Sequence, residues 1–181
     1  NDEMRDVFKL SPQCLKRVKE GHTGNKAGGG FYKRVQTKKG REFHVINGDK
    51  LSYEAQEEIK LDEIAEAKKI KNTAERLKFL SSSDSKVGQF VWDTQRDLLL
   101  YAANRIPEIA DSVEAIDRAV KWGFNWELGP FERWDALGID SVIERLSLEG
   151  IAIPNIINEL RAAGYDSFYS DGKVYDPVSK Q

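Results

Sequence analysis

Hydrophobic positions recur at helical spacing along the second half of the chain. The longest such run is "KVGQFVWDTQRDLLLYAANRI", which begins at Lys86. Its spacing predicts one long amphipathic helix. The positions on the predicted inner face are Val87, Phe90, Val91, Thr94, Leu98, Tyr101, Ala102 and Ile106.

Shorter helices are predicted downstream by their start and stop residues. "DSVEAIDRAVKWG" offers Asp111 or Ser112 as a cap and Gly123 as a stop, and "GPFERWDALG" predicts a helix from Pro130 to Gly138. "DSVIERL" and "PNIINELRAAG" predict two more. The closing "YDSFYSDGKVYDP" is expected to be irregular or extended.

The first part of the chain mixes helix and strand signals. "SPQCLKRVKEG" predicts a short helix with Ser11 as its cap and with Leu15 and Val18 on a buried face. "FYKRVQ" and "REFHVI" alternate like strands and are joined by "TKKG", which predicts a hairpin. Helix is expected again over 54–71 and 72–80. The predicted fold class is mainly α with one small β-hairpin.

Composition narrows the function classes. The chain has 181 residues, enough for one domain or two small ones, with 40% hydrophobic and 32% charged residues. A net charge of −2 gives no general attraction to nucleic acid, and no apolar run is long enough to span a membrane. The single cysteine, Cys14, permits no intrachain disulfide. We therefore expect a cytoplasmic protein without a nucleic-acid partner.

Two segments of the chain resemble each other. Each consists of a proline-started helix, a glycine stop, a loop and an aromatic pair. This pattern suggests a duplicated helical module whose first copy is incomplete, although chance similarity is the alternative. The matching positions are Pro12, Leu15, Val18, Gly21 and Phe31-Tyr32 in the first segment, and Pro154, Ile157, Leu160, Gly164 and Phe168-Tyr169 in the second.

The stretch "GNKAGGG", residues 24–30, raises the question of a phosphate-binding loop. It lacks a preceding strand and the Gly-Lys-Ser/Thr order of a P-loop, and a strand follows it instead of a helix N-terminus. A turn that requires glycine is the favoured interpretation. A contact from Lys26 to a ligand phosphate is the alternative.

Other chemistry-bearing side chains have structural interpretations that weigh more than catalytic ones. His22 and His44 lack a carboxylate at a spacing that would orient them, and no cluster has metal-ligand spacing. Asp117 and Asp135 are expected to cap or orient the Gly129-Pro130 turn rather than to act as an acid–base pair. The basic hairpin could contact the phosphates of RNA or of another ligand, but a charged, solvated sheet edge is favoured.

Two motifs resemble the C-terminal domain of 3-hydroxyacyl-CoA dehydrogenases. "GNKAGGGFYKR" is similar to the tail motif of that domain, and residues 115–140, "AIDRAVKWGFNWELGPFERWDALGID", are similar to its central motif. The matching positions are Gly24, Lys26, Gly28, Gly30, Phe31, Tyr32, Ile116, Asp117, Gly123, Gly129, Pro130, Phe131, Asp135, Gly138 and Asp140. The resemblance implies three parts: the tail of a first helical domain (1–36), a hairpin and charged linker (37–85), and a second, complete helical domain (86–181).

The resemblance also implies different roles for the domains of the intact protein. It predicts an NAD-binding domain upstream and an enoyl-CoA hydratase domain in the same polypeptide, an acyl-CoA substrate in the intact enzyme, and homo-oligomer formation as a possibility. At the place of the family's active-site Asn-Arg pair this chain has Trp92 and Asp93, and Glu127 stands where the proline before Gly-Pro-Phe is usual. We therefore expect no catalytic, cofactor or metal residue in this chain and no activity of the chain alone. A stand-alone helical interaction module is the alternative.

Overall fold

The chain divides into two compact units. The computed structural model describes residues 2, 4–38, 40–48, 50, 52–57 and 59–180. The N-terminal unit is Asn1–Lys60 and the C-terminal unit is Leu61–Gln181.

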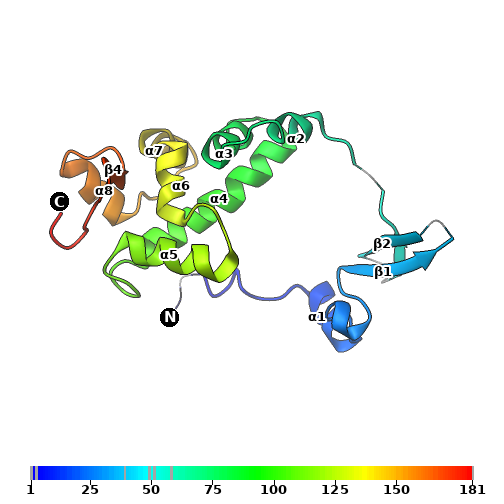
Figure 1. The fold of residues 1–181 in the computed structure, drawn as a ribbon. Coiled ribbons are helices and arrows are strands. Elements are labelled where there is room, and N and C mark those ends of the chain that lie inside the picture. The colour runs from blue at the N-terminus through cyan, green and yellow to red at the C-terminus, as the bar shows by residue number, and fades with distance from the viewer. Residues whose placement is uncertain are drawn as a thin grey trace. The chain divides into compact units, whose positions relative to one another are not determined.

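The N-terminal unit combines one helix with a three-stranded antiparallel sheet (Figure 1). The Ser11 hydroxyl accepts the Cys14 N–H, which confirms the predicted cap, and the predicted hairpin forms. A third strand, which the sequence did not predict, pairs with the second. The elements are α1 (Pro12–Lys19), the 3-10 turn η1 (Asn25–Ala27), β1 (Tyr32–Thr37), β2 (Gly40–Ile46) and β3 (Tyr53–Ala55).

The predicted inner face of α1 is wrong for this chain. Leu15 and Val18 are 45% and 53% exposed, whereas Arg17 is buried with its guanidinium 4.6 Å from the centre of the Phe31 ring. Among the described residues of this unit, Ile46 is the one buried hydrophobic side chain. The unit therefore has too little apolar surface of its own to cover α1.

The C-terminal unit is helical and ends in a small hairpin (Figure 1). The mainly α fold class is therefore confirmed. The closing stretch is more ordered than expected, because its last strands pair antiparallel. The elements are α2 (Asp62–Ala67), α3 (Thr73–Ser81), α4 (Lys86–Asn104), α5 (Val113–Phe124), α6 (Pro130–Leu137), α7 (Ile139–Leu148), α8 (Asn155–Ala162), β4 (Tyr169–Ser170) and β5 (Lys173–Val174).

Two predicted boundaries are wrong. The helix expected over 54–71 is only Asp62–Ala67, since Glu54 lies in β3 and Ile59 is 78% exposed, so no apolar stripe supports a longer helix. Gly123 does not stop α5. The helix continues to Phe124 and ends at Asn125, whose backbone is left-handed, a conformation that Asn tolerates.

The core of the C-terminal unit is built around α4 and α6. Helix α6 packs on α3, α4 and α5, and α8 packs on α4. Trp134 is fully buried and its indole N–H donates to the Leu99 carbonyl at 3.3 Å. The predicted inner face of α4 is partly wrong, because Phe90 is 69% exposed and Trp92 is buried instead.

Candidate functional site

The α5–α6 junction contains a buried carboxylate that serves as the cap of α6. Helix α6 starts with Gly129, which has no side chain, and Pro130, which has no N–H. The first amides that need an acceptor are therefore those of Phe131 and Glu132. Asp117, on α5, accepts them at 2.8 Å and 3.0 Å.

The same junction depends on the absence of a side chain at Gly129. A Cβ there would lie 2.5 Å from Cβ, Cγ and Oδ1 of Asp117. The Gly129 N–H donates to the Glu132 carboxylate at 2.7 Å, and Glu132 also pairs with Lys121 at 2.6 Å. Burial raises the pKa of Asp117, although its amide and hydroxyl donors act in the opposite direction.

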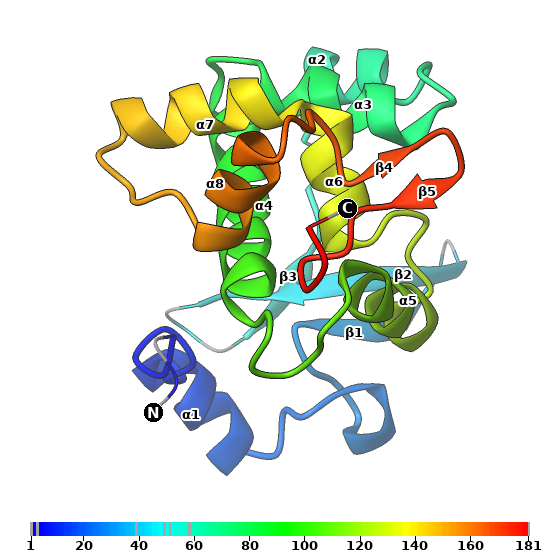
Figure 2. The same ribbon diagram turned by 90° about the vertical axis from the view of Figure 1, so that its left-hand side faces the viewer.

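A second carboxylate, that of Asp135 on α6, holds the C-terminal hairpin. It accepts the N–H groups of Phe168 at 2.8 Å and Tyr169 at 2.9 Å. The Tyr169 hydroxyl donates to Asp117 at 2.8 Å, so both acids bind the start of β4, which lies beside α6 (Figure 2). Burial raises the pKa of Asp135 to about 6 and also raises that of Tyr169.

The remaining residues of the central motif complete this framework. The Phe131 ring packs edge-on against Phe168, with ring centres 4.8 Å apart. Gly138 ends α6 with a φ of +87°, a conformation that favours glycine, and Asp140 pairs with Arg161 at 3.1 Å. The oxygens of Asp117 and Asp135 are occupied by protein donors, so this arrangement binds the hairpin to the helices.

The glycine loop does not form a cradle for phosphate. Its amides donate to carbonyl groups of the loop itself or of Tyr32, including reciprocal bonds of 3.0 Å between Gly24 and Gly29. Gly28 has a φ of +86°, and the Gly30 carbonyl accepts the Tyr53 hydroxyl at 2.8 Å. The amides used in this way are those of Gly24, Ala27, Gly28, Gly29 and Gly30. They are unavailable to the phosphates of a dinucleotide such as NAD.

The other predicted residues of the N-terminal unit lie apart from any catalytic arrangement. Lys26 is exposed, and Phe31 and Tyr32 are 60% and 53% exposed. The His22 ring is 3.3 Å from the Tyr53 hydroxyl, and His44 Nε2 is 3.9 Å from Glu42. No group of metal-binding side chains occurs among the described residues.

Trp92 and Asp93, the pair expected at the place of the family's active-site residues, lie on α4 and contact other side chains of the C-terminal unit. Trp92 is buried, donates its indole N–H to Glu149 at 2.6 Å, and has the Arg145 guanidinium 4.2 Å from its ring. Asp93 pairs with Arg96 at 3.0 Å. Sequence reasoning missed this cluster, because Glu149 is 57 residues from Trp92 and no local spacing connects them.

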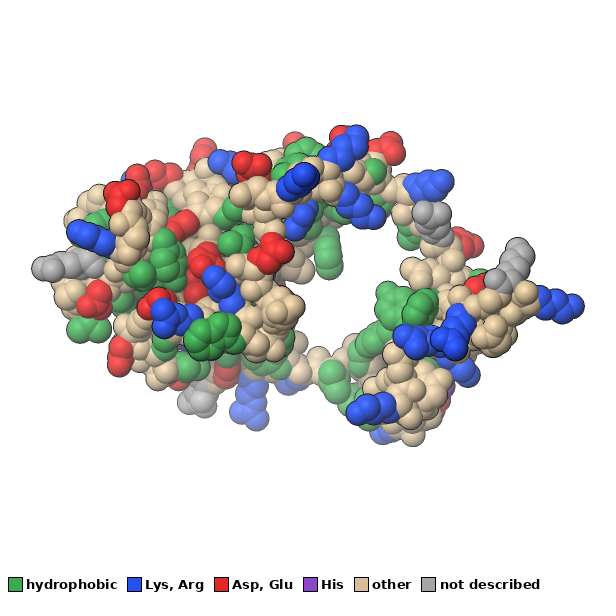
Figure 3. All heavy atoms as spheres, in the orientation of Figure 1, with side chains coloured by type: hydrophobic (Ala, Val, Ile, Leu, Met, Phe, Trp, Pro, Cys, Tyr) green, Lys and Arg blue, Asp and Glu red, His purple; other side chains and the backbone are tan. Residues whose placement is uncertain are grey.

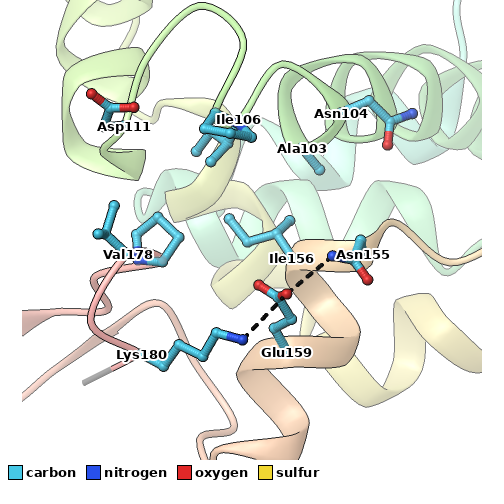
Figure 4. Close-up of a pocket in the computed structure, with 11 residues that line it drawn as sticks. Ala103, Asn104, Ile106, Asp111, Asn155, Ile156, Glu159, Val178 and Lys180 are labelled. Atoms are coloured by element: carbon cyan, nitrogen blue, oxygen red, sulfur yellow. Dashed lines mark hydrogen bonds and ion pairs between the residues drawn. The ribbon is translucent and has the colours of Figure 1, made fainter.

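A cavity of about 420 Å³ opens between the end of α4 and the start of α8 (Figure 4). Two acids, Asp111 and Glu159, line it. Glu159 accepts from Asn155 at 3.1 Å and from Lys180 at 3.4 Å. The cavity wall is otherwise largely apolar, with Ile106, Ile156 and Val178.

Comparison with known proteins gives relatives that are named as a 3-hydroxyacyl-CoA dehydrogenase or as fatty acid oxidation enzymes. The chain is 38% identical over 173 residues to a Bacillus subtilis protein whose name includes "3-hydroxyacyl-CoA dehydrogenase", covering 94% of this chain and 21% of that protein. The resemblance to 3-hydroxyacyl-CoA dehydrogenases is confirmed. No protein-family profile matches, and no solved structure gives a significant match.

Two further relatives have names that refer to fatty acid oxidation. A Rickettsia felis protein whose name includes "fatty acid oxidation complex trifunctional enzyme" is 27% identical over 185 residues, and its Rickettsia prowazekii counterpart is 26% identical. The chain spans about a fifth of the length of each of these three relatives. None of its described helices has the length and apolar character needed to cross a membrane.

Proposed function

We propose that this chain is a C-terminal helical part of a cytoplasmic, NAD-dependent 3-hydroxyacyl-CoA dehydrogenase of fatty-acid β-oxidation. The intact protein would oxidise (S)-3-hydroxyacyl-CoA to 3-oxoacyl-CoA. The observation that carries this proposal is the 38% identity, over 94% of the chain, to a protein named for that activity. The names of the trifunctional relatives support the presence of other domains in the same polypeptide, and we propose that one of them is an enoyl-CoA hydratase domain.

The role proposed for this chain is structural, with NAD bound by another domain. Hydride transfer needs a base near neutral pH and a dinucleotide site. The glycine loop uses its amides internally, and Asp117 and Asp135 are engaged by the hairpin. These observations support the proposal that the chain is inactive alone. Its proposed role is to position the other domains of the intact protein.

We further propose that the N-terminal unit contains the tail of a first helical domain. Ile157 and Leu160 on α8 are fully buried under their own unit, whereas the equivalent Leu15 and Val18 are exposed. Upstream helices equivalent to α4–α7 would cover α1. The hairpin and the charged segment at 37–85 would then link this tail to the second domain.

The test is oxidation of NADH with a short 3-oxoacyl-CoA. It compares this chain with a version extended upstream by an NAD-binding domain and the missing helices. We expect turnover only from the extended protein. Turnover by the 181-residue chain would refute the structural role, and an inactive but folded extended protein would favour the stand-alone interaction module.

A further inference from the structure

The cavity between α4 and α8 takes no part in the proposed function. Its volume of about 420 Å³ lies within the range of small-molecule sites. Four segments of the C-terminal unit form its wall, namely the end of α4, the loop before α5, helix α8 and the C-terminal tail. Apolar side chains make up the larger part of this wall, as the close-up shows for Ile106, Ile156 and Val178 (Figure 4). A ligand in the cavity would therefore place an apolar body against them.

The charged groups on the wall favour a cation. Asp111 and Glu159 are its acids, and Lys180 is the one base that lines it among the described residues. Asp111 is exposed and has no ion-pair partner in the described part of the chain. Arg105, which lies near the cavity in the chain, is paired with Glu108 at 2.8 Å. Figure 3 shows acidic side chains beside hydrophobic ones at the end of this unit that carries α8 and the C-terminus.

The chain already places one ammonium group of its own at this wall. The Lys180 Nζ lies 3.4 Å from an oxygen of the Glu159 carboxylate. A turn holds the tail in this position, because the Asp176 carboxylate accepts the Val178 N–H at 2.9 Å. The Lys180 side chain is 55% exposed, so its ion pair is a weak one that a ligand can replace. A lysine side chain is itself an alkylammonium ion, and it therefore indicates the class of ligand that suits an acid beside an apolar wall.

We propose that this cavity binds a free primary alkylammonium ion, with Lys180 as an intramolecular competitor. The ammonium group of the ligand replaces the Lys180 Nζ beside Glu159, and Asp111 adds to the attraction from the loop before α5 (Figure 4). The alkyl chain lies against the apolar side chains of the wall. A metal ion suits the cavity less, because such a wall offers few oxygen ligands and no metal-binding group occurs among the described side chains. The proposal does not depend on the dehydrogenase function.

The experiment is an NMR titration of the isotope-labelled 181-residue chain with ethylamine, n-propylamine and n-butylamine at neutral pH, where these amines are protonated. Shifts of the backbone amide signals report both the Kd and the location of binding. We expect saturable shifts centred on Asn155, Glu159 and Val178. Each added CH₂ is expected to lower the Kd about threefold, because more apolar surface leaves water. n-Butanol and butyrate lack the positive charge and are expected to bind at least about fivefold more weakly than n-butylamine.

Three substitutions test the charged groups through the Kd for n-butylamine. Glu159→Gln is expected to raise this Kd at least about fivefold, and Asp111→Asn, at an exposed position, about two- to threefold. Lys180→Ala is expected to lower it about two- to fivefold, because Glu159 is then free for the ligand. Glu144→Gln on α7 and Lys86→Ala at the start of α4 are matched controls, both exposed and outside the cavity, and are expected to leave the Kd unchanged. The dispersion of the amide signals checks that each variant is folded.

The inference is overturned if n-butylamine gives no saturable shifts, or if n-butanol or butyrate binds as tightly as the amine. A Kd that is unchanged or higher in the folded Lys180→Ala protein would overturn the role of Lys180 as a competitor. Nα-acetyl-lysinamide carries the same ammonium group on an amino-acid backbone. If it binds more tightly than n-butylamine, the occupant is a lysine of another protein and the free amine is excluded. Because turnover by the extended protein is measured separately, failure of this binding leaves the proposed dehydrogenase function standing.

Discussion

At the residue scale, the α5–α6 junction depends on the buried Asp117 carboxylate occupying the space that a side chain at position 129 would fill. Asp117 reaches the amides of Phe131 and Glu132 because Gly129 leaves room for it. The backbone of Gly129 is in the extended region, with φ of −79° and ψ of 172°, so any residue could adopt its conformation. The requirement for glycine is therefore one of space.

This leads to opposite predictions for two glycines of the same motif. Gly129→Ala is expected to lower the free energy of unfolding by about 2–3 kcal/mol, because the added carbon displaces Asp117 from its hydrogen bonds. Gly123→Ala is expected to raise it by about 0.5–1 kcal/mol, since Gly123 lies inside α5 with open space around it. Urea unfolding followed by tryptophan fluorescence measures both. Similar losses in the two variants would show that space at Gly129 is not the cause.

The sequence predicted part of this site. That Asp117 and Asp135 lie near the Gly129-Pro130 turn follows from their local spacing. Local spacing does not predict that both acids bind the hairpin at Phe168-Tyr169. These partners lie 33 to 52 residues away in the chain. Pairings of this kind depend on tertiary packing, which local spacing does not encode.

At the element scale, α1 and α8 show the difference between local and distant information. Both were predicted from proline near the start and glycine after the end, and both form. Gly21 and Gly164 have φ of +82° and +88°, as left-handed helix stops require. The apolar side chains of α8 are buried and those of α1 are exposed, because burial depends on which elements lie against each helix.

The contrast can be measured by truncating equivalent side chains. Ile157→Ala in α8 is expected to cost about 2–5 kcal/mol, since the side chain is fully buried. Leu15→Ala in α1 is expected to change the stability of this chain by less than about 0.5 kcal/mol. Urea unfolding followed by circular dichroism tests both.

The same pair also tests the tandem-domain proposal. In the version extended upstream, Leu15→Ala is expected to cost about 2 kcal/mol or more, because the added helices would cover this face. An unchanged small effect in the extended protein would count against a first helical domain that packs on α1. Ile157→Ala is the internal control, since its surroundings lie within the C-terminal unit in both proteins.

At the scale of the whole molecule, hydrophobic burial is unevenly divided. The core cluster of buried side chains lies entirely in the C-terminal unit, and its largest members include Trp92 and Trp134. The N-terminal unit contributes Ile46 as its buried hydrophobic side chain among the described residues. A unit of about 60 residues with so little buried apolar surface is at the lower limit of independent stability.

We therefore predict that residues 61–181 fold without the N-terminal unit. All four tryptophans, Trp92, Trp122, Trp126 and Trp134, lie in this unit, so tryptophan fluorescence reports on it alone. The Tm measured in this way is expected to agree within about 2 °C between the separate unit and the full chain. In the full chain, far-UV circular dichroism is expected to show an additional loss of signal below the temperature of the fluorescence transition, because Ile46 is the one buried hydrophobic side chain among the described residues of the N-terminal unit. A fall of more than about 5 °C in the fluorescence Tm on removing residues 1–60 would show that the C-terminal core does not suffice by itself.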